Sequence, residues 1–576
     1  MTAAEATPID DGLIHIGRRA QFITLGAVML GMLLSAIDQT IVGTAMPRIV
    51  ADLNGVEHYS WVVTGYLIAS TACVPIFGKL SDIFGRKWLY MAGIAIFLLG
   101  SMLAGLSQSM AQLIAFRTLQ GFGAGMMTPI AQAIIGDIFT PAERGKYQGL
   151  LIAVFGLATI FGPALGGFIT DNFGWHWVFF VNLPFGIAAL VAVFLVLPSH
   201  TALHRRPKID WWGSAAIIAA VVPLLLALTW GGSTYAWDSP QIIGLLAAAV
   251  VFGIAFILIE RRAEAPTIPL ELFRNRIFAA SAVITFLNGM GMFATILYIP
   301  LFVQGALGDT ATNSGFILTP LMLGVIVMSV TSGLVLSRTG RYKVLAVAGT
   351  ALTTAGMLLL SQMSMDTDSA TLVRNMVVLG FGMGISLALY TIVVQHAFPV
   401  ERLGVVTATL VFCRSIGGVV GVAILGSVMT NHLTSQLQSG MATLPPAAAA
   451  KLGPLASNPQ ALLDSGAQAA LKAQLAAMGP AAQQIAGQIS DILRGAVASA
   501  VTQVFLVGSG LIAVAFVTSF FLREIPLRAT RHTLVDEVEE IGFELGADLG
   551  DELQAEIVLD AEEREAAAVA GQDAAE

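Results

Sequence analysis

The chain has 576 residues, a mean hydropathy of +0.79 and only 11% charged residues, a composition that excludes a soluble globular protein. Its net charge of −8 comes from residues 529–576, which hold fifteen Asp or Glu against Arg531 and Arg564. The rest of the chain is net positive. This charge pattern indicates a membrane domain followed by a solvated acidic tail.

Fourteen apolar segments are about as long as a helix that crosses roughly 30 Å of hydrocarbon, so we predict an all-α membrane protein with fourteen spans. In chain order the predicted spans are residues 22–44, 58–77, 88–107, 112–134, 147–170, 175–197, 209–230, 240–260, 277–303, 314–336, 344–363, 372–394, 403–430 and 496–522.

The short loops show which side of the membrane they face. Residues 1–21 are polar and contain no small-residue cleavage site, so the first span is expected to be retained. If the spans alternate, the Lys and Arg residues of the loops gather on one side, and the opposite short loops 107–111, 171–174, 231–239, 304–313 and 364–371 contain none. By the positive-inside rule, both termini of this multi-pass protein are cytoplasmic and it lies in the cytoplasmic (inner) membrane.

The chain contains an internal repeat, because Gly78–Lys87 follows the second span and the similar Gly333–Lys343 follows the tenth. If each loop follows the second helix of a six-helix unit, spans 7 and 8 are an inserted pair. The predicted domains are a cytoplasmic segment 1–21, an N-terminal six-helix bundle 22–197, two inserted helices 209–260, a C-terminal six-helix bundle 277–522 and an acidic cytoplasmic tail 523–576.

Two segments lie outside this predicted core. The external insert 431–495 is rich in Ala, Gln and Pro; residues 466–477 predict a short helix, and Pro480 suits the first turn of another. The insert could cap the external mouth, dock an envelope partner or act as a passive linker. Residues 532–560 of the tail fit either an amphipathic helix or a disordered acidic segment.

Asp38 is the one carboxylate well inside a predicted span. An ionised acid in hydrocarbon costs several kcal/mol, so such a residue faces a cavity or a partner and marks a functional site. The alternative is a structural ion pair that locks two helices together. Asp38 lies six residues from the outer end of span 1, and Arg117 lies about five from the outer end of span 4. At 1.5 Å per residue both lie within roughly 10 Å of the outer boundary, so we expect them to pair.

Four groups of residues have the spacing of known motifs. They are Ile37-Asp38-Gln-Thr40-Ile-Val42-Gly43 in span 1; the loop residues Gly78, Asp82, Gly85, Arg86 and Lys87 with the companion residues Asp137 and Arg144; Arg117-Thr-Leu-Gln120-Gly121-Phe-Gly123-Ala-Gly125 in span 4; and Gly156, Gly162, Pro163, Gly166 and Gly167 in span 5.

Together these groups, from about residue 22 to 523, resemble the fourteen-helix drug:proton antiporters of the major facilitator superfamily. The resemblance implies two six-helix bundles plus two inserted helices. It also implies an exporter, because the span 5 group resembles the antiporter motif. Two departures stand out: Gly43 replaces the commoner Asn, and Gly125 replaces the usual alanine, which we interpret as a minor difference.

The loop group is predicted to form a cytoplasmic gate. Asp82 can face the N-terminus of a helix from the other half, where the helix dipole favours an acid. Arg86 and Lys87 are expected to hold the cytoplasmic surface, with Arg86 paired to Asp137. The resemblance implies a latch that breaks when the inner gate opens; the alternative is charge that only sets topology.

Arg414 lies near the middle of span 13 with no acid at its depth. It either contacts an anionic or polar part of a substrate or bonds helix carbonyls, and we favour a structural or gating role. Because the deep charges are net positive, we expect neutral, zwitterionic or weakly acidic amphiphiles as substrates. The candidate cavity residues are Gln120, Asn288, Met290, Met292, Phe293, Tyr298, Tyr390 and Arg414.

The sequence therefore predicts a proton-coupled secondary exporter of amphiphilic drugs or toxic compounds, with Asp38 as the proton site. The alternative is a dedicated exporter of an envelope lipid or an endogenous metabolite. We expect a monomer, with no cofactor, metal or nucleic acid. The histidines show no metal-ligand spacing, and no nucleophile–base pair or phosphate-binding motif indicates an enzyme.

Overall fold

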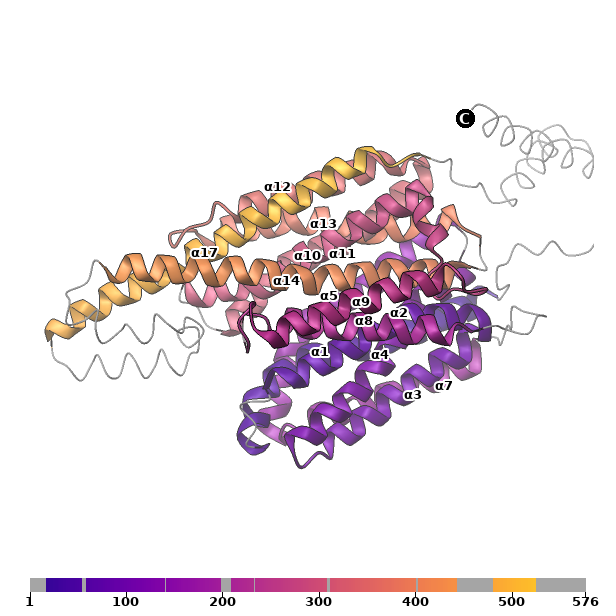
Figure 1. Ribbon diagram of the computed structural model, residues 1–576, viewed down its shortest axis with the longest axis horizontal. Helices are drawn as coiled ribbons and strands as arrows, with labels where there is room; N and C mark the ends of the chain where they lie inside the picture. Colours follow the sequence, from indigo (N-terminus) through magenta and orange to yellow (C-terminus); the bar gives the residue numbers. More distant parts are fainter. Residues whose placement is uncertain are drawn as a thin grey trace, which may run out of the picture. The chain divides into compact units, whose positions relative to one another are not determined.

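The computed structural model describes residues 17–53, 59–139, 141–197, 209–232, 234–307, 311–399, 402–442 and 480–524, and these residues are mostly helical (Figure 1). The helix predicted at 466–477 and the acidic tail at 532–560 lie outside the described residues. The helices are α1 (Arg18–Leu53), α2 (Tyr59–Phe84), α3 (Arg86–Gly105), α4 (Met110–Ile138), α5 (Pro141–Phe173), α6 (Trp177–Phe180), α7 (Asn182–Val196), α8 (Trp211–Trp230), α9 (Pro240–Glu260), η2 (Leu270–Arg274), α10 (Arg276–Gly305), α11 (Ala311–Thr339), α12 (Tyr342–Leu360), α13 (Ser369–Ala397), α14 (Leu403–Met441) and α17 (Pro480–Phe520).

Twelve helices of the described part are long and apolar enough to cross a membrane. The helices α4 and α5 occupy two of the predicted spans but are not among the twelve. Helix α4 falls short because Arg117, Gln120 and Gln132 lower its hydropathy, whereas α5 contains positions whose side chains lie outside the described part of the chain. The multi-pass helical architecture is therefore present, whereas the count of fourteen spans stays a prediction.

The helices form two packed groups that meet along four helices. In the first group α1 packs on α5 and α7, and α4 packs on α2 and α3; in the second, α10 packs on α14 and α17, and α13 packs on α11 and α12. Between the groups, α5 packs along α11 and α2 packs along α14. Each group has its own apolar core.

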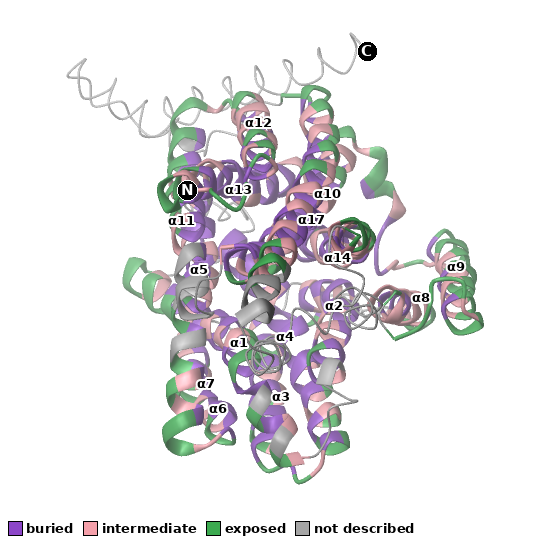
Figure 2. Ribbon diagram, turned by 90° about the vertical axis from the view of Figure 1, so that its left-hand side faces the viewer, coloured by how far each residue is buried: buried purple, intermediate pink, exposed green. Residues whose placement is uncertain are grey.

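The inserted pair of helices lies beside the contact between the two groups. Helix α8 packs against α2 and α14, and α9 packs against α8 (Figure 2). Half of the apolar side chains of α9 are exposed; Val250 and Val251 are each 61% exposed. These side chains are expected to contact lipid, because exposure of so continuous an apolar surface to water is unfavourable.

Part of the predicted external insert 431–495 is helical. Helix α14 continues beyond residue 430 to Met441, and α17 begins at Pro480, so residues 431–441 and 480–495 extend the helices of the last two spans. The prediction ended both spans where hydropathy falls, but helical hydrogen bonding continues through polar residues outside the apolar stretch. Pro480 does stand in a first helical turn, as its missing N–H group allows.

The repeat visible in the sequence has a matching backbone. Gly85 has φ 86° and Gly340, at the equivalent position of the second repeat, has φ 65°. Residues other than glycine rarely adopt a positive φ angle, because their Cβ atom meets the backbone. Each loop thus has a glycine with positive φ at the equivalent position, between α2 and α3 and between α11 and α12.

Helices α2 and α4 touch backbone to backbone. A Cβ atom added to Gly121 would lie 2.8 Å from Tyr66 Cα, and one added to Gly125 would lie 2.9 Å from Ser70 Cα. Both distances are shorter than a carbon–carbon contact allows. Interpreting Gly125 as a minor departure from alanine was therefore wrong, because α2 occupies the space that an alanine side chain would need.

We expect Gly125→Ala to destabilise the protein by about 1–3 kcal/mol, because the added methyl group would push α2 and α4 apart. The matched control is Gly244→Ala on α9, where no atom lies within 4 Å of an added Cβ and alanine favours the helix. Thermal unfolding of the purified protein in detergent measures both. An unchanged midpoint for Gly125→Ala would contradict the close approach of the two helices.

Candidate functional site

The motifs in span 1 and span 5 lie against each other. A Cβ atom on Gly162 would come within 2.7 Å of Thr40 Cβ, and one on Gly166 within 2.7 Å of the Ile41 carbonyl oxygen. Thr40 Oγ1 also donates to the Ala158 carbonyl at 3.1 Å. Small residues on α5 therefore let α1 approach closely, which fixes the position of the helix that carries Asp38.

Asp38 lies in a buried polar cluster inside the first helix group. Its Oδ2 forms an ion pair with the Arg117 guanidinium, and both residues are at most 2% exposed. Its Oδ1 accepts from Gln120 Nε2 at 2.8 Å and from Asn182 Nδ2 at 2.9 Å. The expected contact between Asp38 and Arg117 is present, and two amides complete the coordination of the carboxylate.

Aromatic rings cover the other side of the Arg117 guanidinium. Its Cζ lies 4.4 Å from the centre of the Tyr66 ring and 5.9 Å from that of Phe179. The negative face of an aromatic ring attracts a cation, so the pair is stabilised without contact with water. Arg117 also donates to Gln120 Oε1 at 2.8 Å. The cluster therefore joins α1, α2, α4 and α7.

Two members of this cluster differ from the sequence analysis. Gln120 was expected in the central cavity, but it is fully buried and bonds Asp38. Its place one turn after Arg117 explains this, since residues three apart share a helix face. Asn182 was missed, although an amide at the start of an apolar segment is a signal in the sequence. Its Nδ2 also donates to Ser101 Oγ at 2.9 Å.

The gate group forms a second charged cluster at the end of the bundle where α2 meets α14. Asp82 Oδ1 accepts from the Gly404 N–H at 3.0 Å and Oδ2 from the Val405 N–H at 2.8 Å, at the N-terminus of α14. Arg86 bonds Asp82 at 2.5 Å and Asp137 at 2.8 Å. We call Asp82, Arg86, Asp137 and these two N–H groups the latch.

The remaining basic residues of the gate group bind helix C-termini. Lys87 Nζ donates to the Phe194 carbonyl at the end of α7 at 2.8 Å, and Arg144 donates to carbonyls of Gly136 and Phe139 at the end of α4. Cations are favourable at these ends of helices. Arg86 was expected at the surface, but it is 9% exposed, because two acids and Ser81 supply partners in the interior.

A central cavity of about 180 Å³ lies between the two helix groups. Met292, Phe293 and Arg414 line it as expected, together with Gln39, the residue after Asp38. No Asp or Glu is among the described residues that line it. Asp38 itself lies behind the wall. Met290 does not line this cavity; it packs against Gly421 of α14.

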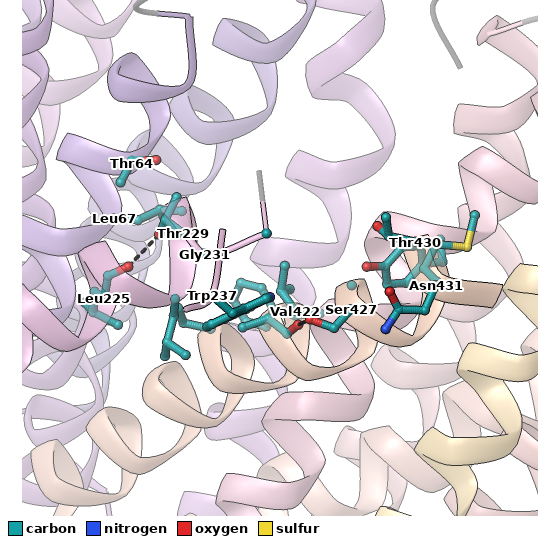
Figure 3. Close-up of a pocket in the computed structure, with 18 of the residues that line it drawn as sticks. Thr64, Leu67, Leu225, Thr229, Gly231, Trp237, Val422, Ser427, Thr430 and Asn431 are labelled. Carbon is teal, nitrogen blue, oxygen red and sulfur yellow. Dashed lines mark hydrogen bonds between the residues drawn. The ribbon is translucent and has the colours of Figure 1, made fainter. Parts of the chain in front are cut away.

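A larger side cavity of about 460 Å³ adjoins the central one, and the two share Leu67, Phe293 and Val419. Residues of α2, α8, α10 and α14 line it, with Thr229 on α8, Trp237 in the loop between α8 and α9, and Ser427, Thr430 and Asn431 on α14 (Figure 3). Tyr298 belongs to this side cavity. Asn288 and Tyr390 lie instead in a small recess beside Arg414.

Comparison with known proteins gives consistent matches over most of the chain. The family model described as Major Facilitator Superfamily matches residues 28–422. Two proteins of Bacillus subtilis (strain 168) are similar: Multidrug transporter protein MdtP is 40% identical over 519 residues, covering 88% of this chain and 94% of the relative. Multidrug resistance protein 3 is 39% identical over 511 residues, covering 88% and 96%.

A solved structure has a similar fold. The crystal structure of the human organic anion transporter MFSD10 (TETRAN) has a TM-score of 0.57 and 15% sequence identity, and the match covers 87% of this chain and 99% of that chain. At this level of identity the likeness concerns the fold alone.

The latch predicts a measurable change when Asp82 loses its charge. Asp82→Asn would weaken the bonds to Arg86 and the α14 N-terminus, and a loss of about 1–2 kcal/mol shifts a two-state ratio by about 5- to 30-fold. Spin labels at Trp88 and Arg402, with both native cysteines replaced, should then report longer distances in pulsed electron–electron resonance.

The control is Asp171→Asn, because Asp171 is an exposed acid near the C-terminal end of α5, whereas Arg144 of the gate group lies near its N-terminal end. It should leave the distance distribution as in the parent protein. The same distribution in Asp82→Asn and in the parent would contradict a latch held by this carboxylate.

Proposed function

The chain belongs to the major facilitator superfamily and is similar to bacterial proteins named as a multidrug transporter and a multidrug resistance protein, and we propose that it exports amphiphilic drugs or toxic compounds in exchange for protons. It is a multi-pass membrane transporter. In this proposal Asp38 is the proton-coupling residue, and Arg117 is its partner.

The observation that carries the proposal is the coordination of Asp38. The ionised carboxylate suits its surroundings, since one cation and two amide groups donate to it. A proton on Asp38 removes the ion pair and leaves the Arg117 cation with only Gln120 and the aromatic rings. The interactions between α1, α4 and α7 thus depend on one proton, which is what a coupling site requires.

A short path leads from this cluster to the central cavity. Gln39 follows Asp38 on α1 and lines the cavity, and its Nε2 lies 3.5 Å from the Tyr66 hydroxyl. The Tyr66 ring covers Arg117. Ser35, one turn before Asp38, lines the same cavity. Movement of α1 on protonation therefore changes the cavity wall, and occupancy of the cavity changes the affinity of Asp38 for its proton.

The latch supplies the second part of alternating access. The positive-inside rule assigns the end of the bundle that carries Asp82 to the cytoplasm. With Asp82 bound to α14, the two helix groups are held together there, while the side cavity extends to Thr430 and Asn431 toward the other end of α14. We assign this arrangement to the outward-facing state.

The substrates follow from the cavity lining. Met292, Phe293 and several aliphatic residues provide an adaptable apolar surface, and scattered hydroxyl and amide groups bind polar atoms. Such a surface accepts varied amphiphiles. Export of these compounds from the cytoplasm across the inner membrane gives resistance to them.

We expect Asp38→Asn to reduce proton-driven efflux to the background level, because asparagine keeps the size of the side chain but cannot carry the proton. The measurement is substrate efflux from pump-deficient cells or proteoliposomes with an imposed pH gradient. Thermal unfolding of the same variant shows whether the fold is intact. Asp171→Asn should transport at the parental rate, and undiminished efflux by a folded Asp38→Asn would refute the coupling role.

A second experiment separates drug export from export of an envelope lipid. In proteoliposomes, we expect a pH gradient to drive uptake or release of amphiphilic dyes while the distribution of fluorescent lipids stays at the protein-free rate. Gradient-driven movement of the lipids with no movement of the dyes would favour the dedicated exporter instead.

A further inference from the structure

Arg414 is a cation in the wall of the central cavity, and its side chain has no partner in the described part of the chain. It lies on α14, and no hydrogen bond or ion pair joins its side chain to another residue in the part of the chain that the structure describes. An arginine cannot lose its proton in a protein, so it stays charged in an apolar site. The other deep arginine, Arg117, has a carboxylate for this purpose.

Close helix packing fixes the position of Arg414. A Cβ atom on Gly289 would lie 3.1 Å from the Arg414 carbonyl carbon, and one on Gly417 would lie 2.8 Å from that of Phe286. One on Gly421 would lie 2.6 Å from Met290 Cα. Helices α10 and α14 therefore touch backbone to backbone around Arg414, and its guanidinium projects from a rigid base.

The recess beside Arg414 holds further polar groups without partners. It has a volume of about 10 Å³ and is lined by α10, α13 and α14. The Thr285 hydroxyl, both amide atoms of Asn288, and the hydroxyls of Ser386 and Tyr390 make no hydrogen bond within the described chain. Asn288, Ser386 and Tyr390 are each at most 6% exposed. Buried polar groups without partners are costly, so this set points to a ligand or to water.

The recess opens toward the central cavity. Leu387, Thr391, Val411 and Arg414 line both spaces. A group bound to Arg414 can thus reach the donors of the recess directly or through one water molecule, for which its volume is about sufficient.

The charges around the cavity select the sign of the ligand. Among its described lining residues, Arg414 is the one charged side chain, and Asp38 is occupied by three donors behind the wall. An anion on the ligand would compensate Arg414, whereas a second cation would add to its charge. Arginine binds carboxylates through two parallel N–H bonds, which orients the ligand as well.

We propose that Arg414, with Asn288, Ser386 and Tyr390, forms an anion-binding subsite, and that the preferred substrates are amphiphiles with one carboxylate. The carboxylate binds Arg414, and the apolar body lies against Met292 and Phe293. This subsite rests on the proposed function, because it assigns the central cavity to the substrate.

The test is equilibrium binding of a matched pair of probes, 1-naphthaleneacetate and 1-naphthaleneacetamide, to the purified full chain in detergent. Isothermal calorimetry with empty micelles as blank gives both dissociation constants. A charge-assisted bond predicts that the wild type binds the carboxylate about ten- to a hundredfold more tightly than the amide. Arg414→Gln should abolish this preference, and Arg414→Lys should keep part of it.

The control variant is Arg338→Gln, an exposed arginine in the last turn of α11, which should bind like the wild type. Equal affinity of the wild type for the two probes would overturn the proposal without any variant. So would an unchanged preference in Arg414→Gln.

The binding experiment uses no gradient, so its outcome is independent of proton coupling. A preference for the carboxylate without proton-driven export would support the subsite and refute the proposed function. Proton-driven export with equal binding of both probes would support the proposed function and refute the subsite.

Discussion

A charge enclosed among apolar helices has to be compensated by an opposite charge or by hydrogen bonds. Three charged residues among the helices, Asp38, Arg86 and Arg414, have this compensation to different degrees. Asp38 has a cation and two amide donors. Arg86 has two carboxylates, one of which is shared with the N-terminus of α14. Arg414 has no such partner within the described chain. The first two sites hold helices together, and the third is free to act on what enters the cavity.

The same constraint explains why some contacts were predictable from the sequence. Acids and arginines are rare in apolar segments, so residues at equal depth have few alternatives for pairing. Asp38 with Arg117 followed from that rule, whereas Arg86 with Asp137 followed from the motif resemblance, and the structure contains both contacts. Uncharged polar residues follow no such rule, because each can bond its own helix. Gln120 was therefore assigned to the cavity, and Asn182 was overlooked.

Helix ends and close approaches were predicted less well. Hydropathy locates the part of a helix that is apolar, whereas α14 and α17 continue through polar residues beyond it, where buried residues such as Leu433 and Leu437 pack in the core. A glycine in a sequence does not reveal which backbone lies over it. Gly125 was interpreted as a minor change, although α2 requires it. Close approaches of this kind also lie next to the charged sites: Gly162 packs beside Thr40 near Asp38, and Gly417 follows Arg414.

The inserted helix α8 packs on α2 of the first helix group and on α14 of the second. It also supplies part of the wall of the side cavity, through Leu225 and Thr229. In the transport cycle proposed above, the two helix groups tilt apart. A helix in contact with both cannot then move as a rigid body with each of them, so α8 would slide along one group while it covers the groove between them. In this proposal the inserted helices are a sliding seal that keeps acyl chains away from the cavities.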